Sequence, residues 1–215
     1  MPAFGRHRYR SADGRLELFA RDYPGDGPPL LLMHGLTRNS ADFEPLAAHL
    51  SGRFRLVVPD QRGRGRSDWD PDPANYRPDI YAADMFALLD SLGIGPVAII
   101  GTSMGGLIAM VMAAMQPAGI TAIAFNDIRP EIDPAGLARI QAYVSAGAGV
   151  GFSGWDEAAR RCAAINGAAF PDFEPQDWLA FARRTCREVA DGTVILDYDP
   201  AIAGNATGDD PATVP

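Results

Sequence analysis

Gly101-Thr102-Ser103-Met104-Gly105-Gly106 is the stretch that decides the fold of this chain, and it has the pattern Gly-x-Ser-x-Gly. A short apolar run, residues 97–100, precedes it, and an apolar segment with helical character, residues 104–115, follows it. The chain must therefore reverse sharply between a strand and a helix, which places the central serine in a strained backbone conformation. The glycines two positions to either side leave room for this turn. We expect Ser103 Oγ to project from the carboxyl end of a sheet, where open α/β folds bind their ligands.

The strand-and-helix rhythm extends to both sides of this turn. Apolar runs bounded by Gly or Pro predict buried strands, and apolar residues at i, i+3, i+4 and i+7 predict helices. The predicted strands cover residues 29–34, 54–58, 97–100 and 120–125, the predicted helices cover 40–50, 78–92 and 104–115, and an Asp-Gly turn predicts an antiparallel hairpin over 7–23. Buried strands that alternate with helices predict an α/β fold with a mostly parallel, doubly wound sheet.

The alternation of predicted strands and helices ends near residue 130. Residues 130–200 have helical patterns, many aromatic side chains and one short strand expected at 193–196. We interpret this block as a helical cap inserted after a core of residues 1–129. Residues 201–215 show no periodicity and are expected to form a loop-like tail.

Two loops flank the predicted site. His34-Gly35-Leu36-Thr37 follows the strand at 29–34, and Gly35 would let the backbone approach a reacting centre closely. The loop 60–67, Asp-Gln-Arg-Gly-Arg-Gly-Arg-Ser, carries arginines and glycines that could suggest phosphate or dinucleotide binding. Both readings are weak because a third glycine and an immediate helix are missing. We interpret this segment as a structural loop beside the site.

Together these motifs resemble the α/β-hydrolase fold superfamily, in its serine-nucleophile branch with a helical cap. The resemblance covers residues 8–127 motif by motif and the cap by architecture only. It implies that Ser103 is the nucleophile and that the backbone N–H groups of Leu36 and Met104 form the oxyanion hole, with His34 and Gly35 in support. Such preorganised donors contribute roughly 3–4 kcal/mol each to acyl transfer.

The resemblance also narrows the chemistry. Relatives that open epoxides or displace halide use Asp at the elbow, so Ser103 favours esterase, lactonase, C–C hydrolase or thioesterase chemistry, with perhydrolase activity also open. No His-Glu-x-x-His motif or clustered His and Asp ligands support a metal hydrolase, so neither a metal nor a cofactor is expected.

A serine nucleophile needs a base, and the order in this family is Ser, then an acid, then His. The three histidines, His7, His34 and His49, all precede Ser103 and none matches the catalytic position. Asp127, at the end of the strand after the elbow helix, is a candidate acid. A loop carboxylate that hydrogen-bonds to nearby backbone is the more favoured alternative at this position.

The family's sheet continues after the cap with two more strands and helices, roughly 50–60 residues by average element and loop lengths. We therefore expect the sequence to be a C-terminally truncated hydrolase whose sheet lacks its last strands and helices. On this expectation, the catalytic histidine lies outside the chain.

Composition excludes several other classes. The 215 residues carry a formal net charge of −8, which argues against nucleic-acid binding and, more weakly, against binding to anionic membranes. The two cysteines, Cys162 and Cys186, make neither a disulfide framework nor a zinc site. The charged first ten residues show no secretory signal, and a cytoplasmic location is expected.

The sequence thus predicts a serine hydrolase that acts on a small, mostly apolar ester, lactone or C–C bond substrate through an acyl-enzyme on Ser103, impaired or inactive as the truncated chain. The alternative is a non-catalytic protein that binds a small molecule in the same pocket. The oligomeric state stays open.

Overall fold

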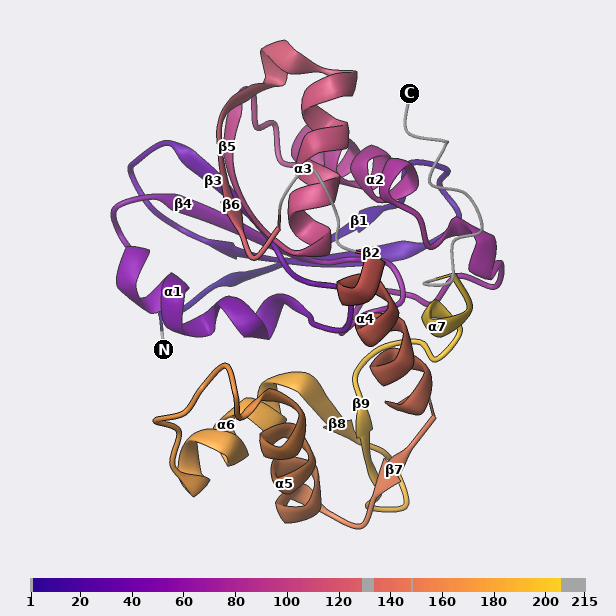
Figure 1. Ribbon diagram of the computed structural model, residues 1–215. Coiled ribbons are helices and arrows are strands. Elements are labelled where there is room, and N and C mark those ends of the chain that lie inside the picture. Colours follow the sequence, from indigo (N-terminus) through magenta and orange to yellow (C-terminus); the bar gives the residue numbers. More distant parts are fainter. Residues whose placement is uncertain (1, 129–133, 148, 206–215) are drawn as a thin grey trace.

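The computed structural model describes residues 2–128, 134–147 and 149–205, and it divides into a large sheet with helices and a smaller unit beneath it (Figure 1). The strands of the large sheet are β1 (Gly5–Arg10), β2 (Glu17–Tyr23), β3 (Pro29–Met33), β4 (Arg55–Asp60), β5 (Val97–Thr102) and β6 (Ile120–Asn126). The helices of this part are η1 (Ser40–Phe43), α1 (Glu44–Leu50), η2 (Pro73–Asn75), α2 (Pro78–Ser91), α3 (Met104–Met115) and η3 (Pro117–Gly119). The predicted hairpin, strands and helices are confirmed, except that β6, expected to be buried, is largely exposed because β5 is its only neighbour in the sheet among the described residues.

The six strands lie in the order β1-β2-β4-β3-β5-β6. β1, β2 and β4 pair antiparallel, whereas β4, β3, β5 and β6 are parallel to one another. Parallel strands end at the same edge of a sheet, so the loops after β3, β4, β5 and β6 meet there. This edge carries every site residue predicted from the sequence.

Alternate residues of the central strands face different helices, as a pleated strand requires. Leu31 and Met33 of β3 belong to the core formed with α2 and α3, whereas Leu30 and Leu32 belong to the core formed with α1. The sheet is therefore wound on both faces, which explains why its strands are apolar runs without polar alternation.

The smaller unit follows β6 and covers the residues for which a cap is predicted, so we call it the cap. It contains α4 (Pro134–Gly147), β7 (Gly151–Phe152), α5 (Trp155–Asn166), α6 (Pro175–Thr185), β8 (Cys186–Glu188) and β9 (Val194–Leu196). It has its own hydrophobic core, in which Phe152, Trp178 and Phe181 are buried.

This unit differs from the expectation of an all-helical cap in one respect. β7, β9 and β8 form an antiparallel sheet in which the longest strands have only three residues. Strands this short cannot display the alternation by which a strand is recognised in sequence. The strand expected at residues 193–196 is present as β9.

The chain then returns to the large core. Tyr198 and Ile202 are buried against it, and α7 (Ile202–Asn205) forms where a loop was expected. A single turn of helix with one buried apolar side chain is too short to show a helical periodicity in the sequence. The rest of the expected tail, residues 206–215, lies outside the described residues. None of the helices in the described ranges has the length and apolar character needed to span a bilayer.

Candidate active site

Ser103 occupies the sharp turn between β5 and α3. Its backbone has φ 51° and ψ −115°, a conformation that residues with side chains rarely adopt. The turn is held on both sides, because the Ser103 N–H donates to the carbonyl of Asn126 at 2.9 Å and the Gly106 N–H donates to the carbonyl of Ser103 at 2.8 Å. The neighbouring strand and the first turn of the helix thus impose the strained geometry.

The glycines of the motif are required by contact distances. A Cβ placed on Gly101 would lie 2.5 Å from the carbonyl oxygen of Gly105, and one on Gly105 would lie 2.2 Å from the carbonyl oxygen of Met33. Both distances are far inside van der Waals contact. The elbow therefore packs α3 directly onto the ends of β5 and β3.

The loop after β3 lies against the elbow. A Cβ on Gly35 would be 3.7 Å from Ser103 Cβ, so the Gly35–Leu36 backbone lies next to the serine. Within the described part of the chain, the backbone N–H groups of Leu36 and Met104 have no hydrogen-bond acceptor. Unpaired backbone donors at a largely buried position are rare in proteins. Leu36 therefore follows a glycine that lies beside Ser103, and Met104 follows Ser103 in the chain.

Arg64 supports this arrangement from behind, and sequence reasoning missed it. Its side chain is fully buried, its Nε donates to the carbonyl of Leu36 at 3.0 Å, and one Nη donates to the hydroxyl of Tyr81 at 2.7 Å. Holding that carbonyl fixes the orientation of the adjoining peptide. The guanidinium also places a positive charge close to the predicted oxyanion hole.

The rest of the 60–67 loop is anchored by buried polar contacts. Asp60 accepts hydrogen bonds from the backbone N–H groups of Ser40, at 2.6 Å, and Arg66, at 2.9 Å, and burial raises the pKa of its carboxyl group. Arg62 is fully buried and pairs with Asp84 at 2.7 Å. These contacts agree with a structural loop beside the site.

His34 is buried completely and both ring nitrogens are occupied. Its Nδ1 donates to the carbonyl of Gly35 at 2.8 Å, and its Nε2 accepts from the backbone N–H of Gln61 at 3.1 Å. Burial lowers the pKa of His34 to about 3, so the ring is neutral near pH 7. This side chain links the loops after β3 and β4 and has no nitrogen left to act as a base.

No base contacts Ser103 in the described ranges, where its Oγ has no hydrogen-bond partner. The other two histidines are elsewhere: His7 of β1 hydrogen-bonds to Ser91, and His49 is exposed on α1. Asp127 is exposed directly after β6, at φ 54°. Its neighbour Asn126 pairs with Thr102, so Asp127 lies beside the elbow. Among the described residues its carboxylate has no hydrogen bond or ion pair.

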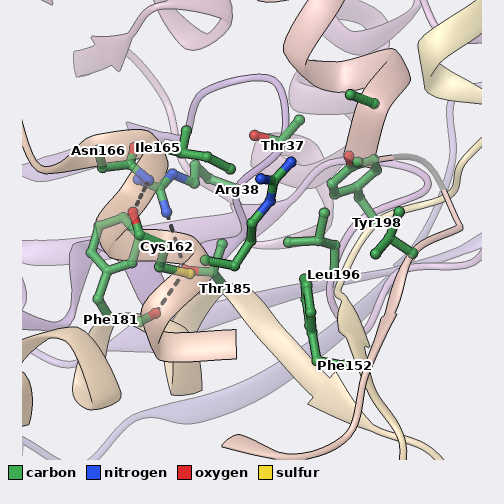
Figure 2. Close-up of a pocket in the computed structure, with 14 residues that line it drawn as sticks. Thr37, Arg38, Phe152, Cys162, Ile165, Asn166, Phe181, Thr185, Leu196 and Tyr198 are labelled. Atoms are coloured by element: carbon green, nitrogen blue, oxygen red, sulfur yellow. Dashed lines mark hydrogen bonds between the residues drawn. The ribbon is translucent and has the colours of Figure 1, made fainter. Parts of the chain in front are cut away.

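A small cavity of about 50 Å³ lies where the cap meets the core (Figure 2). Thr37 and Arg38 reach it from the loop after β3. Figure 2 shows Cys162, Asn166 and Phe181 of the cap on one side of it, and Phe152 and Leu196 of the cap with Tyr198 of the core on the other. The sequence offered no signal for this cavity, because its lining residues are spread from Thr37 to Tyr198 and meet only in the folded chain.

Comparison with known proteins identifies the family of the chain. A family model described as "alpha/beta hydrolase fold" matches residues 28–186. The chain belongs to the α/β-hydrolase family.

Related α/β-hydrolases cover most of the chain. It is similar to the crystal structure of an α/β-hydrolase from Novosphingobium aromaticivorans DSM 12444, with a TM-score of 0.90 and 42% identity, covering 100% of this chain and 75% of the other. A 3-hydroxybutyrate-oligomer hydrolase from Cupriavidus necator is 36% identical over 183 residues, which are 84% of this chain and 61% of the relative. A 2-(acetamidomethylene)succinate hydrolase from Mesorhizobium japonicum is 38% identical over 134 residues, 62% of this chain and 47% of the relative. The chain thus spans about half to three fifths of these two curated relatives.

Proposed function

We propose that this α/β-hydrolase chain carries the nucleophile and the oxyanion hole of a serine hydrolase for small, mostly apolar esters, lactones or C–C bond substrates. One observation carries the proposal: Ser103 lies in a strained elbow beside two backbone N–H groups, of Leu36 and Met104, that have no acceptor within the described residues. The N-terminus of α3 adds its positive dipole end at the same place. The relatives named as hydrolases of small molecules support a substrate of this size.

In the proposed reaction, Ser103 Oγ attacks the substrate carbonyl carbon and forms a C–O bond while the carbonyl π electrons move to its oxygen. The N–H groups of Leu36 and Met104 donate hydrogen bonds to this oxyanion, whose charge they stabilise by roughly 3–4 kcal/mol each. A base outside the described residues takes the serine proton, and Asp127 is our candidate for the acid that orients this base. Collapse of the intermediate breaks the bond to the leaving group, which is an alkoxide for an ester or lactone and a carbanion for a C–C bond substrate, and the protonated base returns the proton to it. Water, deprotonated by the same base, then attacks the acyl-serine, releases the acid and restores the serine hydroxyl.

The alternative, a binding protein without turnover, is favoured by one observation. Ser103 Oγ has no hydrogen-bond partner among the described residues, and a serine without a base is a weak nucleophile. The same two N–H groups would then bind the carbonyl or carboxylate oxygen of a ligand.

Labelling with a fluorophosphonate separates the two functions. The 215-residue chain and a Ser103→Ala variant would be treated with the probe, with and without added imidazole as an external base. We expect labelling of Ser103 that imidazole accelerates and that is absent from Ser103→Ala. Equal labelling of both chains, with imidazole present, would overturn the hydrolase proposal, and ligand-induced thermal stabilisation without labelling would establish the binding function.

We also propose a cytoplasmic location. Cys162 and Cys186 are both free thiols buried in the cap core, and a reducing compartment preserves such thiols.

A further inference from the structure

The cavity between cap and core has an unusual charge for this protein. The chain has a formal net charge of −8, yet the cavity lining contains two arginines, Arg38 and Arg161, and no acidic side chain. The remainder of the lining is largely apolar, with Phe152, Ile165 and Leu196 among its members. A local positive charge within an apolar wall favours an anion with an apolar body.

Arg38 connects this cavity to the nucleophile. Its Cγ lies 3.9 Å from the position of a Cβ on Gly35, which is itself 3.7 Å from Ser103 Cβ. From there the side chain extends into the cap, where one Nη donates to Thr185 Oγ1 at 3.1 Å and the guanidinium carbon lies 4.2 Å from the centre of the Phe181 ring. The stem of the arginine therefore lies beside Gly35, which also lies beside Ser103, and its guanidinium lies in the cavity lining.

The charge of Arg38 is only weakly compensated. Its closest carboxylate in the described structure is Asp42, with an Nε to Oδ2 distance of 3.9 Å, and its side chain is 19% exposed. By contrast, Arg62 has carboxylate oxygens at 2.5 and 2.7 Å from its nitrogens. A guanidinium has five N–H donors, and Arg38 uses one of them in a hydrogen bond to another described residue. Several donors are left for a ligand.

Arg161 of α5 provides a second free cation on the same cavity. It is exposed, and among the described residues no carboxylate lies within ion-pair distance of its side chain. Its neighbour Arg160 lines a different surface, a groove formed by residues of α5 and α6. The two adjacent arginines thus face different surroundings, and only one of them reaches the cavity.

We propose that the substrate is an anionic ester, whose carboxylate binds Arg38 and Arg161 in the cavity while its scissile carbonyl lies at Ser103. The cavity volume of about 50 Å³ fits a small terminal group rather than a long chain. Arginine suits this role because its planar donors match the two oxygens of a carboxylate. This inference rests on the proposed function and specifies its substrate class.

Calorimetric titration of the 215-residue chain tests the inference without requiring turnover. The probes are monomethyl glutarate, which has one carboxylate and one ester, and dimethyl glutarate, which is neutral. We expect the anion to bind at least tenfold more tightly than the diester, and Arg161→Gln to lower this preference about tenfold. Arg38→Lys keeps the charge but loses the planar donors, so we expect it to lower the preference less than Arg161→Gln does.

Arg160→Gln is the matched control, because it removes the same charge from the neighbouring position of the same helix. It is expected to keep the preference of the unmodified chain. Equal affinity for the two probes, or equal losses in Arg160→Gln and Arg161→Gln, would overturn the inference. Failure of the hydrolase proposal is recognised separately, since it appears as absent labelling of Ser103 with the anion preference intact.

Discussion

At the scale of single residues, the backbone of Ser103 stores strain that the surrounding structure must hold. A non-glycine residue at φ 51° and ψ −115° costs on the order of 1–3 kcal/mol, whereas glycine adopts such angles readily. We expect Ser103→Gly to be at least as stable as Ser103→Ala, although glycine is usually the less stable choice by roughly 0.5–1 kcal/mol. Urea unfolding of the two variants measures this difference. A clear advantage for Ser103→Ala would show that the turn is not strained.

The buried histidine makes stability depend on pH. The pKa of His34 is about 3 in the folded chain, because burial disfavours the charged ring, against 6.5 in the unfolded chain. Folding favours the neutral ring, so His34 contributes its full free energy of folding above pH 6.5. This contribution is lost as the pH falls from 6.5 toward 3, because the unfolded chain then binds a proton that the folded chain does not. From the size of this shift, the loss amounts to at most roughly 5 kcal/mol.

Asp197 has the opposite dependence on pH, because burial raises the pKa of its carboxyl group to about 6. The protonated form that folding favours is lost as the pH rises from 4 to 6, and the folded chain loses stability over that range. The difference in unfolding free energy between the natural chain and His34→Gln cancels the contribution of Asp197. We expect this difference to shrink as the pH falls from 7 to 4. A difference that stays constant over this range would contradict a neutral, buried His34.

Some residues of the candidate site could be predicted from a short stretch of sequence, and others depend on contacts between distant parts of the chain. Ser103 and the Gly35–Leu36 loop could be predicted because each belongs to a short motif beside a predicted strand. Arg64 and Arg38 could not, because their roles depend on the carbonyl of Leu36 and on Thr185, which only the tertiary structure brings to them.

At the scale of elements, the close contact between α3 and β3 depends on a missing side chain. A Cβ on Gly105 would lie 2.2 Å from the carbonyl oxygen of Met33, and neither group belongs to a flexible side chain. We expect Gly105→Ala to destabilise the chain by about 3 kcal/mol or more, because the helix must shift away from the sheet. Gly95→Ala is the control, since nothing lies within 4 Å of the added carbon. Thermal unfolding of both variants gives the comparison, and equal melting temperatures would rule out the tight contact.

Long helices and strands could be predicted from the sequence, whereas very short ones could not. α2, with fourteen residues, and the buried strands carry clear patterns, and the sequence placed them closely. The two-residue β7 and the four-residue α7 carry none, because their existence depends on the β9 strand and on the core that Ile202 enters.

At the scale of the whole molecule, one edge of the sheet exposes apolar surface. Among the described residues β6 pairs only with β5, and Phe125 of β6 and Met115 of α3 are 48% and 50% exposed. An unpaired strand edge beside apolar side chains favours association. We expect the 215-residue chain to bind a hydrophobic dye and to self-associate at high concentration.

Ala122→Lys places a charge on this exposed strand and is expected to reduce both effects, whereas Ala48→Lys on the exposed surface of α1 is not. Light scattering against concentration measures association, and dye fluorescence measures exposed apolar surface. Equal association and equal dye fluorescence in the two variants would show that the β6 edge is not the surface through which the chain associates.

The predicted reacting groups and the cavity lining come from different units, which has a consequence for directed evolution. The groups predicted to perform the chemistry lie in the core, on loops fixed by glycines and buried arginines, whereas most side chains that shape the cavity come from the cap. Randomising the codon for Ile165, which lines the cavity and is 43% exposed, would therefore vary the proposed pocket for a ligand without altering the loops that carry Ser103 and Leu36. Selectivity and reactivity should evolve along independent routes in this scaffold.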